Sequence, residues 1–96
     1  MARYRILCWR HIPSLVEASD GREAVQRPLS QRFQDLIDAV AMREGASESQ
    51  AYLDGWHHGP EEERSGDPAA VAAQVAEELE EGFEDFLAKR FLAPPA

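Results

Sequence analysis

The chain has 96 residues, of which 44% are hydrophobic and 29% charged, and these proportions indicate a single globular domain. Its formal net charge of −8 disfavours nucleic acid and anionic membranes as partners, because both are themselves negatively charged. One cysteine cannot form an internal disulfide, and the sequence shows neither a signal peptide nor an apolar run long enough to span a bilayer, so we expect a cytoplasmic protein.

Three strands are predicted in the N-terminal part of the chain. Residues 3–9 alternate between polar and apolar side chains and include aromatic and branched residues, which predicts a strand. Pro13 interrupts the pattern, and residues 14–19 predict a second extended segment. The pair Asp20-Gly21 indicates a hairpin, since glycine accepts the positive φ of a tight turn. Residues 22–28 are therefore predicted to return as a third strand at the edge of a sheet.

Two amphipathic helices are also predicted. The first follows Ser30, whose side chain can accept a hydrogen bond from the first turn, and Gly45 is placed to end it. Its apolar positions recur at helical spacing: Phe33, Leu36, Ile37, Val40 and Ala41. The second opens at Asp67-Pro68, with the aspartate as N-cap and the proline at the first helical position. It runs towards Pro94-Pro95 and has an apolar side formed by Val71, Val75, Leu79, Phe83 and Phe86.

Residues 49–58 fit two interpretations. An alternation of two sets of residues favours a strand: Ala51, Leu53 and Gly55 against Tyr52, Asp54 and Trp56. A short helix over residues 46–56 is the alternative, because Ser47 and Gln50 have the spacing of a capping box. The aromatic residues favour the strand.

Together these elements give the order β-β-β-α-β-α and the α+β fold class. We expect a small antiparallel or mixed sheet of three to four strands with the two amphipathic helices on one face. Residues 1–92 form the predicted single domain, and residues 93–96 are expected to fray as a C-terminal tail.

The residue types that carry catalysis do not form a recognisable constellation. His57 and His58 are adjacent and would point to opposite faces of a strand, and with Cys8 and His11 they lack the spacing of zinc ligands. We therefore predict no metal and no cofactor, and we expect Cys8 to behave as a small hydrophobic residue. No phosphate-binding loop, nucleophile elbow or metalloprotease helix occurs in the sequence, which favours a domain that is not an enzyme.

The main candidates for binding lie at the ends of two predicted strands. Trp9 is followed by Arg10, and Trp56 is followed by His57. If the two strands are neighbours, the two tryptophans form one aromatic patch flanked by Arg10 and Arg32, and tryptophan and arginine are enriched in binding hot spots. Burial of both tryptophans in the core is the alternative that the sequence leaves open.

Two further hypotheses concern a ligand and a second copy. Arg10, Arg27 and Arg32 could hold a small anion or cofactor near Trp9. A homodimer could form through the exposed hairpin edge, or through an apolar set near the C-terminus: Phe86, Leu87, Phe91 and Leu92.

Several stretches, taken together, resemble the bacterial virulence factor domain family: residues 4–10, 12–13, 25–33, 38–42, 51–60 and 66–68. The resemblance extends from about residue 3 to residue 85, as far as the acidic helix, and includes similarity to the C-terminal region of a conserved staphylococcal virulence factor. It implies a small accessory protein and supplies no catalytic residues. Some similar proteins belong with corrinoid and folate one-carbon enzymes, which implies a protein partner from such a system.

Overall fold

The computed structural model of the chain describes residues 1–45 and 50–88. Its strands are β1 (Ala2–Trp9), β2 (Ile12–Ser19), β3 (Ala24–Pro28), β4 (Trp56–His58) and β5 (Glu62–Arg64). Its helices are α1 (Gln31–Arg43), α2 (Gln50–Asp54), α3 (Pro68–Glu81) and α4 (Phe83–Leu87). The predicted tail, the predicted cap Ser47, Pro94-Pro95 and the Phe91-Leu92 pair lie outside the described residues.

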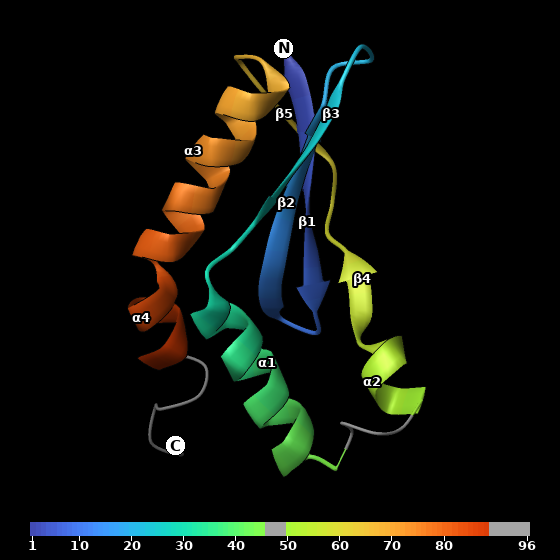
Figure 1. The fold of residues 1–96 in the computed structure, drawn as a ribbon, viewed down its shortest axis with the longest axis vertical. Helices are drawn as coiled ribbons and strands as arrows, with labels where there is room; N and C mark the ends of the chain where they lie inside the picture. Colours follow the sequence, from blue (N-terminus) through green and yellow to red (C-terminus); the bar gives the residue numbers. More distant parts are fainter. Residues whose placement is uncertain (46–49, 89–96) are drawn as a thin grey trace.

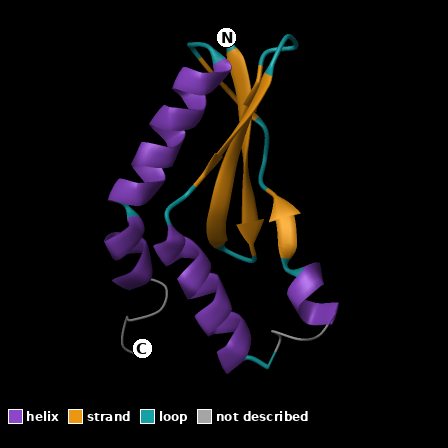
Figure 2. Ribbon diagram, in the orientation of Figure 1, coloured by secondary structure: helices purple, strands orange, loops and turns teal. Residues whose placement is uncertain are grey.

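All the strands join one antiparallel sheet in the order β3-β2-β1-β4, and β5 pairs with the N-terminal half of β1 on the same side as β4. Helix α3 runs along one face of the sheet, while α1 and α2 lie towards the end where β1 finishes (Figure 1). The α+β prediction is confirmed, with a sheet larger than the three to four strands expected. Figure 2 shows how helices and strands separate into layers.

The first hairpin of the sheet joins β1 to β2. Arg10 and His11 form its two-residue turn, and Arg10 adopts a φ of 54°. The prediction that Pro13 separates two strands is therefore wrong, because β2 already begins at Ile12. The register shifts where Cys8 pairs with Pro13, and such an irregularity accommodates a residue that has no amide hydrogen to donate.

The second hairpin was predicted from Asp20-Gly21 and is confirmed. Gly21 has a φ of 90°, and the Asp20 carboxylate accepts hydrogen bonds from the amides of Arg22 (2.9 Å) and Glu23 (3.1 Å). This Asx turn closes the connection over residues 20–23, which is longer than a two-residue turn.

The segment from 50 to 58 divides between the two interpretations. Its first half is helical (α2) and only Trp56–His58 forms a strand, so the expected strand over residues 50–54 is wrong. A tertiary contact anchors this helix to the core, since the buried indole of Trp9 donates from Nε1 to the carbonyl oxygen of Tyr52 at 2.7 Å. Strand β5 was not predicted, and it lies within a run of glutamates that pairs with the start of β1.

Two apolar clusters hold the helices against the sheet. One lies between α3 and the sheet and contains Ala2, Tyr4, Val16, Ala18, Val71, Ala72, Val75 and Ala76. The other lies towards α1 and α4 and contains Trp9, Ile12, Phe33, Ile37, Val40, Ala41 and Phe83. The predicted apolar stripes of both helices thus face these clusters, with Leu36, Leu79 and Phe86 partly buried against them. Within the described ranges, no helix has the length and apolar character needed to cross a membrane.

The predicted helix boundaries are mostly confirmed. Asp67 caps α3 by accepting a hydrogen bond from the amide of Ala70 at 2.8 Å, and Gly45 follows α1 with a φ of 70°. The predicted helix that opens at Pro68 ends earlier than expected, since Gly82 separates α3 from α4.

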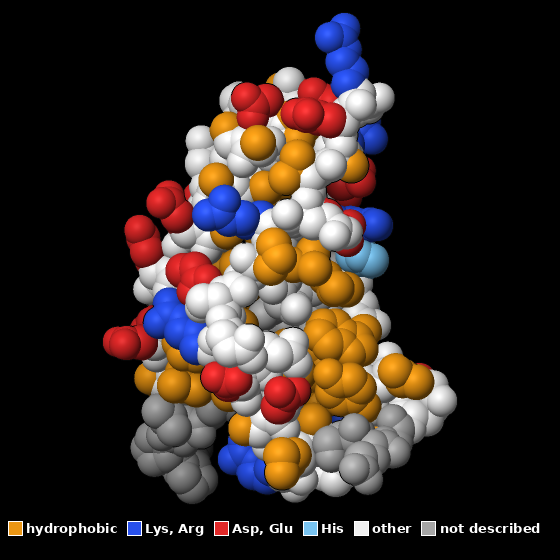
Figure 3. Space-filling view, viewed as in Figure 1, with side chains coloured by type: hydrophobic (Ala, Val, Ile, Leu, Met, Phe, Trp, Pro, Cys, Tyr) orange, Lys and Arg blue, Asp and Glu red, His pale blue; other side chains and the backbone are white. Residues whose placement is uncertain are grey.

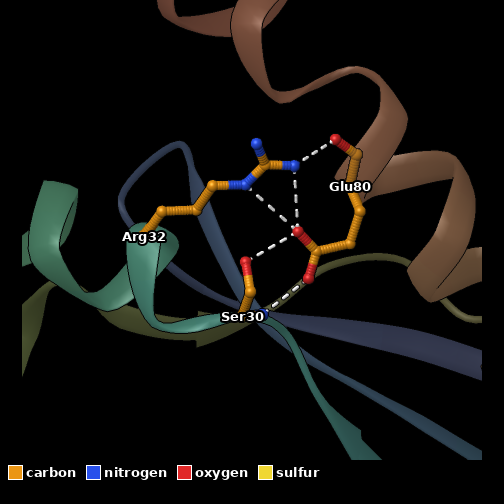
Figure 4. A network of polar contacts seen from close by, with 3 residues as sticks. All are labelled: Ser30, Arg32 and Glu80. Atoms are coloured by element: carbon orange, nitrogen blue, oxygen red, sulfur yellow. Dashed lines mark hydrogen bonds and ion pairs between the residues drawn. The ribbon is translucent and has the colours of Figure 1, made fainter.

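A carboxylate at the end of α3 holds the start of α1 (Figure 4). The hydroxyl of Ser30 donates to Glu80 Oε1 at 2.7 Å, and its amide donates to Oε2 at 2.6 Å. Arg32 donates from Nη2 to the Glu80 carboxylate (3.1 Å) and to its backbone carbonyl (2.5 Å). Ser30 occupies the N-cap position as predicted, but its side chain accepts no capping hydrogen bond, and its hydroxyl is oriented towards Glu80 instead.

We expect Glu80→Gln to lower the free energy of unfolding by about 1–2 kcal/mol at neutral pH, since charge-assisted hydrogen bonds are lost. Burial raises the pKa of the Glu80 carboxyl, but the Ser30 hydrogen bonds and Arg32 outweigh this and hold the pKa below its usual range. A carboxyl with a depressed folded pKa stabilises the fold above its unfolded pKa of about 4.3, and this contribution disappears as the pH falls through the folded pKa.

Urea unfolding of the wild type and Glu80→Gln at neutral pH and at about pH 3 measures this effect. The difference between the two proteins is expected to shrink in acid. Glu77→Gln is the matched control, because Glu77 is exposed on the same helix, and it should change stability at neither pH. A difference for Glu80→Gln that persists in acid would contradict the role assigned to the ionised carboxylate.

Candidate functional site

The face of the sheet opposite α3, here called the open face, carries polar cross-strand contacts. Arg5 and Glu17 are direct partners on β1 and β2, and Arg5 Nε donates to Glu17 Oε2 at 2.9 Å. His58 Nε2 lies 3.3 Å from Glu17 Oε1, which places the His58 side chain on the same face. Burial raises the pKa of Glu17, but hydrogen bonds from Arg5 and His58 outweigh it and the pKa is lowered.

Apolar side chains lie next to this polar group. Leu7 pairs with Leu15 across β1 and β2 and with His58 across β1 and β4, so both leucines belong to the open face. Trp56 stands two residues before His58 and shares its face, and the ring of Tyr52 packs edge-on against Trp56 with centroids 6.0 Å apart. These four residues, all partly buried, are here called the apolar strip: Leu7, Leu15, Tyr52 and Trp56. Figure 3 shows hydrophobic side chains gathered beside β4 and α2.

Trp9 supports the apolar strip from within the protein. It is 0% exposed and is the cross-strand partner of Trp56. Its ring centroid lies 5.7 Å from that of Tyr52, whose carbonyl oxygen accepts the indole hydrogen bond. The core alternative is therefore confirmed for Trp9, whereas Trp56 remains partly accessible.

Arg10 and His57 form a polar rim at the end of the strip. The Arg10 guanidinium lies over the Trp9 ring, 4.6 Å from its centroid, and forms an ion pair with Glu44. The Arg10 amide donates to the carbonyl of Gly55 at 2.8 Å. His57 Nε2 lies 2.6 Å from the Arg10 carbonyl oxygen, so this nitrogen carries the hydrogen and donates it. These contacts fix the backbone of the turn and leave the His57 side chain exposed.

The structure brings together four of the predicted binding residues, Trp9, Arg10, Trp56 and His57, because β1 and β4 are neighbours. Arg27 lies on β3, the strand at the other edge of the sheet.

Arg32 does not join these residues either. Its guanidinium is engaged by Glu80 and lies over the ring of Phe83, 4.5 Å from the centroid. The three arginines of the anion hypothesis therefore do not form one cluster, and anion binding stays a prediction.

No group of three or more metal-ligating side chains occurs in the described ranges. Cys8 is a half-buried free thiol, and burial raises its pKa, which disfavours a nucleophilic thiolate. A depression of about 290 Å³ on the open face lies between Arg3, Arg5, Glu17 and Gln26. Two carboxylates line it, and both form ion pairs, Glu17 with Arg5 and Glu61 with Arg3.

Comparison with known proteins identifies a family. The family model described as virulence factor matches residues 7–89, which is most of the chain and includes all of the apolar strip. No curated protein and no solved structure matches the chain. The likeness to a staphylococcal protein therefore stays a prediction.

Proposed function

The chain belongs to the virulence factor family, and we propose that it acts as a non-catalytic accessory domain that binds a protein partner through the apolar strip. The observation that carries this proposal is the partly exposed strip on the open face, built on the fully buried Trp9. The family name describes no chemistry, so the argument depends on the surface itself.

The composition of the surface supports a protein partner. Tyr52 and Trp56 are large, rigid side chains that are partly buried before any partner binds, so little side-chain entropy is lost when they are covered. Arg10 is likewise held in place, by Glu44 and by the Trp9 ring. An aromatic centre with an arginine at its rim is the arrangement that binding hot spots favour. Polar groups flank the strip on both sides, as at the rim of a protein interface.

The proposal also specifies the class of partner. We propose a component of a corrinoid or folate one-carbon enzyme system in the cytoplasm, and the support is the family resemblance described above. The free Cys8 thiol agrees with a reducing compartment.

Affinity capture from a native lysate tests the proposal. We expect a stoichiometric partner to be captured by the wild type and lost, by about tenfold or more, with the double variant Trp56→Ala, Arg10→Ala, because truncating hot-spot residues costs at least about 2 kcal/mol. Arg22→Ala is the matched control, since Arg22 is exposed on the distant hairpin loop and should leave capture unchanged.

A second variant separates binding from folding. Leu15→Gln keeps a similar volume on the open face and should also weaken capture, while thermal melting verifies that each variant is folded. Equal capture by the wild type and both strip variants would exclude this surface. Capture of proteins unrelated to one-carbon chemistry, still dependent on the strip, would retain the binding role and exclude the proposed partner class.

A further inference from the structure

The outer edge of β3 has unpaired main-chain groups. β3 pairs only with β2 among the described strands, and Figure 1 shows it crossing in front of β2. Helix α3 packs against the face of β3 that carries Val25 and leaves the strand's outer edge without a paired strand. The amide of Leu29 donates to the carbonyl of Ser14 (3.0 Å), and the carbonyl of Glu23 accepts from Asp20 (3.3 Å). Because hydrogen-bonding direction alternates along a strand, the main-chain groups of Ala24 and Gln26 point away from β2.

We propose that this edge pairs with the same edge of a second copy, in antiparallel register centred on Val25. In this register the amide and carbonyl of Ala24 meet those of Gln26 in the second copy, and the reverse pair forms across the two-fold axis. Val25 meets its own counterpart, which extends the apolar cluster against which it already packs. The proposal does not depend on the function proposed above.

Charge along the edge favours a second copy over an unrelated strand. The register centred on Val25 sets Glu23 opposite Arg27 of the second copy, on both sides of the axis. Both side chains are exposed, and neither makes an ion pair within the described ranges. Opposite charges placed symmetrically about one residue complement each other when the strand pairs antiparallel with a copy of itself.

Pro28 favours the register centred on Val25 over the adjacent register centred on Gln26. If the pairing were centred on Gln26, Pro28 would stand opposite Ala24, and its ring has no hydrogen to donate to the outward carbonyl of Ala24. In the register centred on Val25, Pro28 lies beyond the pairs formed by Ala24 and Gln26. It therefore ends the ladder without interrupting it.

The sheet would then continue through both copies. A two-fold axis perpendicular to the sheet keeps like faces together, so the two apolar strips lie on one side and the two α3 helices on the other. A dimer would offer two copies of the strip to the same partner or surface, which raises the overall affinity without new contacts.

Sedimentation equilibrium across about 10 to 500 μM protein tests the dimer, with Gln26→Pro as the main variant. Proline at this position removes an outward amide and no hydrogen bond within the monomer, so the variant should be folded and monomeric. Gln26→Ser is the matched control, because it retains the amide, and it should remain dimeric. A wild type that is monomeric throughout overturns the proposal, and so does a dimer that persists in folded Gln26→Pro.

Charge reversal provides a test that does not introduce proline. Glu23→Arg and Arg27→Glu each replace attraction by repulsion on both sides of the axis, and each should weaken dimerisation by about tenfold or more. The double variant Glu23→Arg, Arg27→Glu restores the pairing and should recover the dimer. Equal weakening in the single and double variants would overturn the register, as would strong binding of an unrelated extended peptide by a chain that stays monomeric.

Discussion

Gly55→Ala is expected to lower the free energy of unfolding by about 2–3 kcal/mol, although it adds only one methyl group. A Cβ at this position would lie 2.5 Å from Nε1 and 2.8 Å from Cε2 of the Trp9 indole. That ring is 0% exposed and hydrogen-bonded to the Tyr52 carbonyl, so moving it aside would lose packing contacts and the hydrogen bond. Urea unfolding measures the loss, which is a large part of the roughly 5–15 kcal/mol that stabilises a domain.

Two controls isolate the steric cause. Gly59→Ala adds the same methyl group at the other end of β4, where the nearest atom is the carbonyl oxygen of Ile6 at 3.6 Å, and its effect should stay within about 0.5 kcal/mol. In a Trp9→Phe background the indole nitrogen is absent, so Gly55→Ala should cost less than in the wild type. Equal costs in both backgrounds would contradict the clash with the indole.

Trp9→Ala is expected to be the most damaging single substitution at the site, with a loss of about 3–5 kcal/mol. It empties a fully buried position, removes the hydrogen bond to the Tyr52 carbonyl, and takes away the ring beneath Arg10. Urea unfolding of the variant, followed by tryptophan fluorescence from Trp56, gives the value.

Trp9→Phe distinguishes support from direct contact. It keeps an aromatic ring in the core but leaves the Tyr52 carbonyl without its partner, so a smaller loss of about 1–3 kcal/mol is expected. Because Trp9 has no exposed surface, partner capture should be unchanged wherever the variant is folded. Loss of capture by folded Trp9→Phe would mean that the partner reaches this ring.

The elements that the sequence predicts well have local causes. The hairpin at Asp20-Gly21 depends on a glycine with positive φ and a carboxylate that binds the next amides. Helix α3 begins where Asp67 and Pro68 satisfy the first turn, and α1 ends at Gly45. Each signal lies within a few residues of the structure that it specifies, so no tertiary information is needed.

The elements that the sequence does not predict have causes distant in the chain. Arg10 adopts a positive φ without being glycine, and its turn is held by the Gly55 carbonyl and His57, which no local pattern indicates. Strand β5 is a run of charged residues that is extended because the start of β1 pairs with it. Helix α2 is anchored by the hydrogen bond from the Trp9 indole to the Tyr52 carbonyl, which joins residues 43 positions apart.

The candidate site could be predicted only in part, because the strand pairing that assembles it joins residues that are distant in the chain. The aromatic residues beside Arg10 and His57 could be identified from the sequence, and the pairing of β1 with β4 joins them. Leu7, Leu15 and Tyr52 were missed as site residues, although alternation places Leu7 on the face of Arg5, which is the polar face of the strand. The signal that could have identified Leu7 as a site residue is its position as an apolar residue on the face that carries Arg5.

The pairing of β1 on both of its edges has a consequence for the order in which the protein folds. The β1–β2 and β2–β3 pairings are local hairpins, which close quickly. The other edge of β1 pairs only when distant residues are available, Arg64 for Ala2 and Trp56 for Trp9. During synthesis, one edge of β1 therefore stays open until most of the chain has left the ribosome. Over that interval, an early three-stranded sheet with an exposed apolar face is the species that a chaperone would meet.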